Sequence, residues 1–173
     1  MEAPLDLTLL TIDRISVYDL TQSNEWLKII LEAGIENNDP SAFRYLINLR
    51  KLNDKNAIEK IEVDLKLREH IVKYKEEQVG LLLGLINPDA DPVLQPINYT
   101  HIFVKKEYRN RGICTEVLRR LSKTHCELQV SDRMMKLIVK NHIMFFPHLV
   151  IPKNKDGTVR FFSWALWMWV KNT

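Results

Sequence analysis

The stretch that decides the fold is Val104-Lys105-Lys106-Glu107-Tyr108-Arg109-Asn110-Arg111-Gly112-Ile113-Cys114. Apolar residues alternate just before it, over residues 97–104, which predicts a strand. After it, apolar residues recur at helical spacing, at Ile113, Val117, Leu118 and Leu121. The sequence therefore predicts a strand, a basic turn and the start of a helix. Such an arrangement can bind an anion, because the first amides of a helix lack internal partners and the helix dipole favours negative charge there.

The residues of the turn point to phosphate as the anion. Gly112 lets the backbone approach a ligand closely. Arg109 and Arg111 carry guanidinium groups, whose geometry suits phosphate. The sequence thus indicates a phosphate-bearing ligand, and the alternative that stays open is a basic turn of an ordinary α/β domain.

Length and composition favour a soluble globular chain. A length of 173 residues suits a single domain spanning residues 1–173. Hydrophobic residues make up 46%, which is enough for a core, and charged residues of both signs make up 27%, which argues against disorder. The net charge of +3 permits an anionic ligand but does not by itself indicate nucleic acid.

Cysteine, histidine and targeting signals set further bounds. A helix between Cys114 and Cys126 would hold them about 18 Å apart, so we expect no disulfide and a reducing compartment. No Cys/His spacing is typical of a zinc site, so we expect no metal. The first residues lack the basic region of a signal peptide, and the longest apolar run, residues 161–170, is too short to span a membrane. We expect a cytoplasmic protein, in the host cytoplasm if the chain is viral.

The predicted elements follow the order strand, helix, helix, strand, strand, strand, helix, strand, helix, strand, strand. Residues 51–68 are ambiguous, and we favour a short helix running into a strand, because Ile61 and Val63 begin an alternating pattern. Thr21 and Ser23 can cap the first helix, and Asp39-Pro40 can begin the second. The remaining predicted elements are a strand within 6–18, helices from Trp26 and Phe43, strands at 71–74 and 79–86 joined by a polar turn at 75–78, a loop at 87–96, a strand at 127–130, a helix from Ser131-Asp132, a short apolar segment at 149–151, a turn at 153–157 and a last strand at 159–170.

The basic turn resembles motif A of the GNAT family, the Gcn5-related N-acetyltransferases, which reads roughly V-x-P-x-x-R-x-x-G-x-G/A. Val104, Arg109 and Gly112 fall in register with it. Lys106 replaces the family's Pro and Cys114 its final small residue. The order of predicted elements also resembles the GNAT order over most of the chain. The resemblance implies an α/β (α+β) fold with a mixed sheet of about six to seven strands flanked by about four helices.

The resemblance also implies acetyl-coenzyme A as cofactor and an amine, on a small molecule or a protein, as acceptor. In the family a splay in the sheet frees strand-edge amides for the pantetheine arm, here those of Phe103 and Val104, and the amide of Val104 would also stabilise the oxyanion. The residues that would hold the pyrophosphate are Arg109, Asn110, Arg111, Gly112, Ile113 and Cys114.

The catalytic residues are unknown from the sequence. Several family members place a Glu or His where this chain has Asn98, and an amide cannot act as a base. His101 is the candidate base, because histidine is the residue type that most often serves as a base near neutral pH. Strand alternation places it on the opposite face from Val104, so a packed or surface role for His101 stays open. No Tyr occupies the position, near Ile138 or Val139, from which the family protonates the thiolate.

Cys114 is not the expected nucleophile. A thiol at a helix N-terminus has a lowered pKa, but no His or acid lies beside it in the sequence, so we expect a structural role.

Two other functions stay open. The first is a non-catalytic GNAT-like interaction protein, whose low glycine and high lysine and asparagine content would suit a viral or phage protein. Its partner would bind through the Trp-rich C-terminal strand, since Trp is a favoured interface anchor; this strand carries Trp164, Trp167 and Trp169. The second is nucleic-acid binding through Lys105, Lys106, Arg109 and Arg111.

Overall fold

The computed structural model describes residues 3–64, 69–84, 97–99, 101–123, 126–129, 132–144, 146–149 and 168–171. The chain divides into two compact units. The first comprises Met1–Ile86 and His101–Ile113, and the second comprises Asn87–Thr100 and Cys114–Thr173. Each unit is described by itself.

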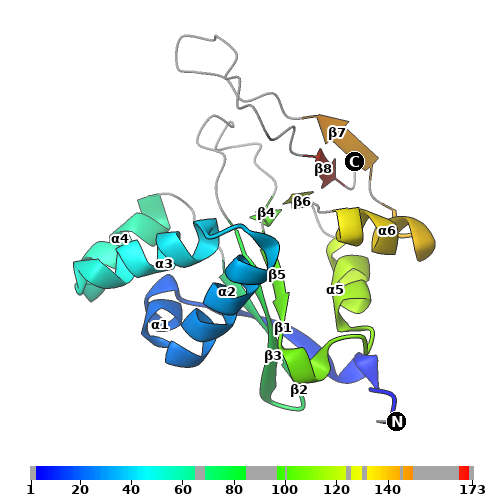
Figure 1. Ribbon diagram of the computed structural model, residues 1–173, viewed down its shortest axis with the longest axis horizontal. Coiled ribbons are helices and arrows are strands. Elements are labelled where there is room, and N and C mark those ends of the chain that lie inside the picture. Colours follow the sequence, from blue (N-terminus) through cyan, green and yellow to red (C-terminus); the bar gives the residue numbers. More distant parts are fainter. Residues whose placement is uncertain are drawn as a thin grey trace. The chain divides into compact units, whose positions relative to one another are not determined.

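The first unit is an antiparallel sheet with four helices. Its strands run in the order β1-β2-β3-β5, and all neighbouring strands are antiparallel. The helices α1–α4 gather on one side of this sheet (Figure 1). The strands are β1 (Leu10–Ile15), β2 (Glu69–Tyr74), β3 (Glu77–Leu83) and β5 (His101–Val104), and the helices are α1 (Val17–Gln22), α2 (Asn24–Asn37), α3 (Ser41–Leu52) and α4 (Lys55–Asp64).

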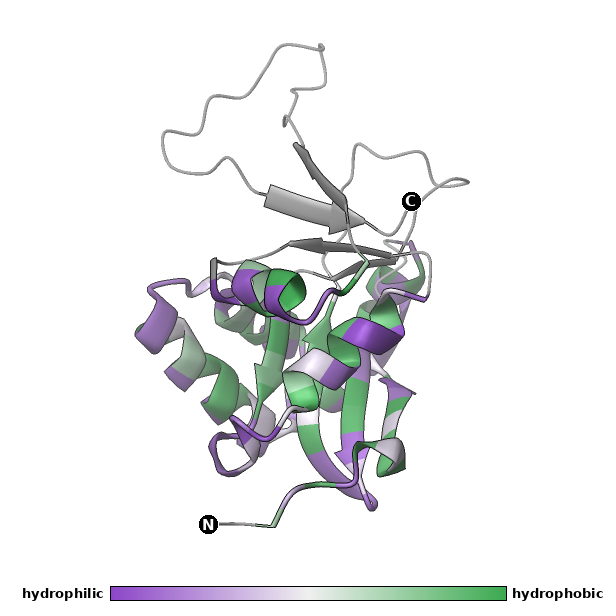
Figure 2. Cartoon of the chain, turned by 90° about the vertical axis from the view of Figure 1, so that its right-hand side faces the viewer, coloured by the Kyte–Doolittle hydropathy of each residue, from purple (hydrophilic) through white to green (hydrophobic). Residues whose placement is uncertain are grey.

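The core of the first unit lies between the helices and this sheet. Helical residues from α1, α2 and α3, among them Trp26 and Leu46, pack against Ile71, Leu81 and Leu83 of the strands. The helices carry hydrophobic stripes, while their other faces are hydrophilic (Figure 2). Burial of this apolar surface is the main source of stability in such a layer.

The predicted helix starts are largely confirmed. The Ser23 side chain caps α2 by accepting from the Trp26 amide at 3.2 Å. Thr21 does not cap it, because Thr21 is buried at the end of α1 and donates to the Tyr18 carbonyl. Asp39 accepts from the amide and hydroxyl of Ser41 at the start of α3, and Pro40 takes the N-cap position.

The strand predicted within residues 51–68 is wrong as far as Asp64. Helix α4 continues to Asp64 and includes Ile61 and Val63. Val63 is 75% exposed while Ile58 is fully buried, so the alternation of Ile61 and Val63 does not mark a buried strand face. Residues 65–68 lie outside the described part of the chain.

Strands β2 and β3 form the predicted hairpin. The turn is tighter than predicted, because Lys75 and Glu76 both have positive φ and Glu77 already pairs with Tyr74. A Cβ on Gly80 would lie 3.0 Å from the Phe103 carbonyl oxygen, so glycine there lets β5 approach β3. The predicted loop 87–96 lies outside the described residues.

The second unit has a mixed sheet in the order β4-β6-β8-β7. Strands β4 and β6 are parallel, and the other neighbouring pairs are antiparallel. The predicted strand at 127–130 and the predicted helices from Ile113 and Asp132 are confirmed. The elements are β4 (Ile97–Tyr99), α5 (Ile113–Leu121), β6 (Cys126–Gln129), α6 (Asp132–Lys140), β7 (Phe146–Leu149) and β8 (Met168–Lys171).

Residues 97–104 do not form one strand of one sheet, as the alternation predicted. Residues 97–99 pair with β6, and residues 101–104 pair with β3. The α/β class with a mixed sheet is confirmed, but the described strands form two four-stranded sheets.

Of the predicted last strand only residues 168–170 are described, within β8, so Trp164 and Trp167 lie outside the described residues, as does the turn at 153–157. No helix in the described part of the chain has the length and apolar character needed to cross a membrane.

Candidate functional site

Strand β5 is an edge strand of its sheet, among the strands that the structure describes. The Lys105 amide donates to the Val79 carbonyl of β3 at 2.9 Å. Because hydrogen-bonding direction alternates along an antiparallel strand, the Phe103 amide also faces β3. The amides of Ile102 and Val104 face the other side. Of the two amides expected to be free for the pantetheine arm, the geometry therefore leaves that of Val104 at the open edge and directs that of Phe103 into the sheet.

The turn after β5 is a short 3₁₀ segment, Lys106–Tyr108, followed by two left-handed residues. Asn110 has φ of +60° and Gly112 has φ of +87°. A Cβ on Gly112 would also lie 3.2 Å from the Leu7 side chain. Glycine is thus favoured at residue 112 for its backbone conformation and for its small size, and helix α5 begins at the next residue.

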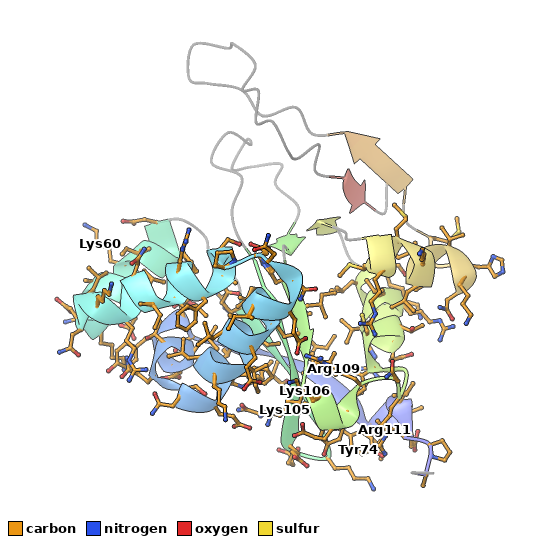
Figure 3. The ribbon with its side chains drawn as sticks, viewed as in Figure 1. Lys60, Tyr74, Lys105, Lys106, Arg109 and Arg111 are labelled. Atoms are coloured by element: carbon orange, nitrogen blue, oxygen red, sulfur yellow. The ribbon has the colours of Figure 1, made fainter. Side chains whose placement is uncertain are left out.

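Three cations of the turn are paired with carboxylates of α2. Lys105 is buried, contacts Glu25 at 2.5 Å and lies over the Trp26 ring. Lys106 pairs with Glu32 and with Glu36, the latter at 3.4 Å. Arg109 pairs with Glu36 at 3.5 Å and donates to the Val104 carbonyl at 3.0 Å. Figure 3 shows these side chains gathered around the turn, and α2 partly neutralises their charge.

Arg111 makes a different set of contacts. Its guanidinium donates to the Ala3 carbonyl at 3.1 Å and lies over the Tyr108 ring. The Tyr108 hydroxyl in turn donates to Glu77 at 2.6 Å. Arg111 therefore holds the N-terminal segment against the turn.

Cys114 is a free cysteine in the first turn of α5. Burial raises the pKa of its thiol, and the nearby Arg133 only partly opposes this. A thiol whose pKa is raised by burial fits the expected structural role. On the same helix Arg120 pairs with Glu116 at 3.1 Å.

His101 lies beside Asp39, at the junction of α2 and α3. Its Nε2 is 3.2 Å from Asp39 Oδ2, and its ring stacks on Phe103, which packs against the helical core. Burial tends to raise the pKa of Asp39, but hydrogen bonds from Ser41 and His101 outweigh it and hold that pKa below its ordinary value. The arrangement is a histidine side chain held beside an ionised carboxylate.

A second polar cluster surrounds Glu69, the first residue of β2. Glu69 is fully buried, and its Oε2 accepts from the Gly84 amide at 2.9 Å. Burial raises the pKa of Glu69 to about 8; the Gly84 amide and Arg14 act against this rise, and Glu62 adds to it. Burial raises the pKa of Tyr45, and the nearby carboxylates of Glu69 and Glu62 raise it further.

The contact of His101 with Asp39 and the electrostatic interaction of Glu69 with Tyr45 join residues that are far apart in the chain, so no local sequence pattern predicts them. The positions at which the family places its acid and its base carry no titratable side chain in this chain. Asn98 lies in β4. Helix α6 contains no tyrosine. Of the two residues at the expected position, Ile138 is buried and Val139 is 66% exposed.

No protein-family model matches the chain, and no curated protein sequence matches it. Solved structures do match. A spermidine N-acetyltransferase SpeG chimera from Vibrio cholerae and hSSAT is 15% identical, with 94% of this chain and 92% of that chain covered and a TM-score of 0.55. A structure of AAC(6')-Ib in complex with ribostamycin and coenzyme A is 12% identical, with the same coverage and a TM-score of 0.55.

A structure of AAC(6')-Ib in complex with parmomycin and AcetylCoA gives a similar result, with 11% identity, the same coverage and a TM-score of 0.54. At such identities the likeness is one of fold. The chain therefore has the fold of the GNAT N-acetyltransferases.

Proposed function

We propose that the chain is an N-acetyltransferase that binds acetyl-coenzyme A and transfers the acetyl group to an amine. The observation that carries the proposal is the Val104 amide, which faces the open edge of β5 immediately before the Gly112 turn. The proteins that share the fold support it, since their descriptions include a spermidine N-acetyltransferase and complexes with coenzyme A or AcetylCoA.

The backbone of the turn fits the cofactor better than its side chains do. The exposed Gly112 backbone and the start of α5 suit the pyrophosphate, and the Val104 amide suits the pantetheine arm. Lys106 and Arg109 already have Glu36 as a partner. We therefore assign the pyrophosphate mainly to backbone amides of residues 110–114, and give Arg109 the additional task of holding the Val104 carbonyl.

The chemistry needs an electrophile, an oxyanion donor and a base. Bound acetyl-coenzyme A supplies a thioester as the electrophile. The Val104 N–H is the donor suited to negative charge that develops on the carbonyl oxygen. His101, whose Nε2 lies 3.2 Å from Asp39 Oδ2, is the candidate base for the amine proton. With no tyrosine on α6, the leaving thiolate would take its proton from water.

The alternative is a non-catalytic protein with the same fold, and Asn98 together with the missing tyrosine favours it. It would bind a protein partner, for which the C-terminal strand with Trp169 is the candidate surface. Nucleic acid is a weaker alternative, because Lys105, Lys106 and Arg109 each have a carboxylate of α2 as partner.

Calorimetric titration with acetyl-coenzyme A, and with its desulfo and dephospho analogues, tests the proposal. We expect micromolar binding that the double variant Arg109→Ala, Gly112→Asp abolishes. The matched control is Arg119→Ala, on the exposed face of α5. Undiminished affinity in the double variant would show that the turn is not the cofactor site, and no binding by the wild-type chain at millimolar cofactor would favour the non-catalytic alternative.

Acetyl transfer to a panel of amines then tests the role of His101. We expect His101→Gln to lower kcat about a hundredfold with little change in cofactor affinity. Asp39→Asn should lower kcat less, because it weakens the orientation of the ring but leaves the base. Equal activity of wild type and His101→Gln would remove His101 from the reaction.

A further inference from the structure

Side chains from three elements meet around Glu69 at the end of β2. Tyr45 comes from α3 and Glu62 from α4, and each interacts electrostatically with Glu69. Arg14 of β1 is the cation of the group and contacts Glu62 at 3.8 Å. Within the part of the chain that the structure describes, these are the charged and titratable groups that interact with Glu69, and they come from α3, α4 and β1.

Two oxygen atoms of this cluster have no hydrogen-bond partner among the described residues. They are Glu69 Oε1 and the Tyr45 hydroxyl oxygen, and both are buried. A buried polar atom without a partner costs free energy, and native structures contain few. When Glu69 is ionised, above its pKa of about 8, both atoms can accept hydrogen bonds from a ligand that donates them.

We propose that Glu69 and Tyr45 form a binding site for a primary ammonium group, which would donate to Glu69 Oε1 and to the Tyr45 hydroxyl oxygen. An ammonium group supplies three donors and a positive charge, and the cluster supplies acceptors and two carboxylates. A metal ion is a poorer match, because the described residues contain no group of three or more His, Cys, Asp or Glu side chains that could hold one. Glu69 and Glu62 are buried, at 0% and 9% exposure, while the Arg14 side chain beside Glu62 is 58% exposed.

The sheet register relates this site to His101. Leu83 pairs with His101 across β3 and β5, and the pairing of His70 with Leu82 places Glu69 opposite Leu83. Directly paired residues share a face, so Glu69 and His101 lie on the same face two strands apart, about 10 Å between their Cα atoms. The buried Leu83 side chain lies between them on that face, so the ammonium site is separate from His101 and does not depend on the proposed function.

Binding of simple amines tests the site without any cofactor. The probes are 1,4-diaminobutane and n-butylamine, and the controls are n-butanol, which lacks the charge, and tetramethylammonium and potassium chloride, which lack N–H donors. We expect both amines to bind and the controls not to. Glu69→Gln should weaken n-butylamine binding about tenfold, and Tyr45→Phe about fivefold. Glu59→Gln, on the exposed side of α4, should change nothing.

The pH dependence adds a second readout. The carboxylate form of Glu69 is the acceptor, and its pKa is about 8 without ligand. Affinity for n-butylamine should therefore rise about tenfold per pH unit up to pH 7 and level off above pH 8, since the amine itself stays charged up to about pH 10. Glu69→Gln should abolish this dependence.

The outcomes are decisive in both directions. The site is overturned if the wild type binds no amine, if n-butanol or potassium binds equally well, or if both variants bind as the wild type does. Loss of binding in the two variants alone supports it. These titrations use no cofactor, so the site and the proposed function can fail separately. Amine binding without acetyl transfer would support the site and remove the proposed function. Acetyl transfer by a protein whose amine binding does not depend on Glu69 would support the proposed function and remove the site.

Discussion

Glu69 is the residue whose protonation the fold controls most strongly. Its folded-state pKa of about 8 lies above its ordinary value of 4.5 because the side chain is fully buried. In the folded state the carboxyl stays neutral over a range of pH in which the unfolded chain has already released the proton. Stability from this group is therefore fully present below about pH 4.5 and is lost as the pH rises through about 8.

We expect the free energy of unfolding of the wild type to fall between about pH 5 and pH 8 by a few kcal/mol relative to Glu69→Gln, since each pH unit contributes about 1.4 kcal/mol. Urea denaturation of both proteins across this range measures the difference. Glu62→Gln is the matched control and should keep most of the slope. Parallel pH profiles for wild type and Glu69→Gln would mean that Glu69 is ionised in the folded protein.

Gly112 is the residue on which the backbone of the turn depends. Its φ of +87° disfavours any residue with a Cβ, and that Cβ would also press on Leu7. Gly112→Ala should cost about 1–2 kcal/mol of stability and weaken cofactor binding, as thermal unfolding and calorimetry would show. Gly112→Asn should be milder in stability, because asparagine tolerates the left-handed region that Asn110 already adopts. Equal stability of Gly112→Ala and wild type would contradict a requirement for glycine.

At the scale of elements, helix α2 acts as an acidic cover for the turn. Glu36 contacts both Lys106 and Arg109, and so occupies two cations that would otherwise face an anionic ligand. Glu36→Gln should therefore tighten binding of coenzyme A severalfold, with a stability change of about 0.5 kcal/mol or less, because these ion pairs are largely exposed. Glu32→Gln, which loses one contact at 3.8 Å to Lys106, should have a smaller effect. Weaker binding in Glu36→Gln would instead mean that Glu36 positions Arg109 for the ligand.

The sequence predicted elements best where local signals agree with burial. Ile113, Val117, Leu118 and Leu121 recur at helical spacing and are all buried in α5. Ile61 and Val63 alternate, yet they belong to α4, because helix formation depends on which residues find a core, and Ile58 is the one that does. The break of residues 97–104 between two sheets was also unpredictable, since an alternating pattern does not say which strand each residue pairs with.

At the scale of the whole molecule, the candidate site was only partly predictable. The turn and its glycine follow from neighbouring residues, and so could be found in the sequence. The contact of His101 with Asp39 and the electrostatic interaction of Glu69 with Tyr45 arise from packing between distant segments, which no local pattern encodes. The sequence does carry a signal for the acidic cover: Glu25, Glu32 and Glu36 are spaced by seven and four residues, which places them along one side of a helix.

The salt dependence of ligand affinity distinguishes cofactor binding from nucleic-acid binding. Nucleic-acid binding through the basic turn would release counterions, so its affinity would fall steeply, by about a thousandfold for six phosphate contacts, between about 50 and 200 mM salt. A cofactor held mainly by backbone amides should lose only about tenfold, because few exposed charges contribute. We expect acetyl-coenzyme A affinity to follow the shallow dependence and a short single-stranded DNA to bind weakly at both salt concentrations. A steep loss of coenzyme A affinity would show that the side-chain cations, released from α2, hold the ligand. Tight DNA binding at low salt would instead favour the nucleic-acid alternative.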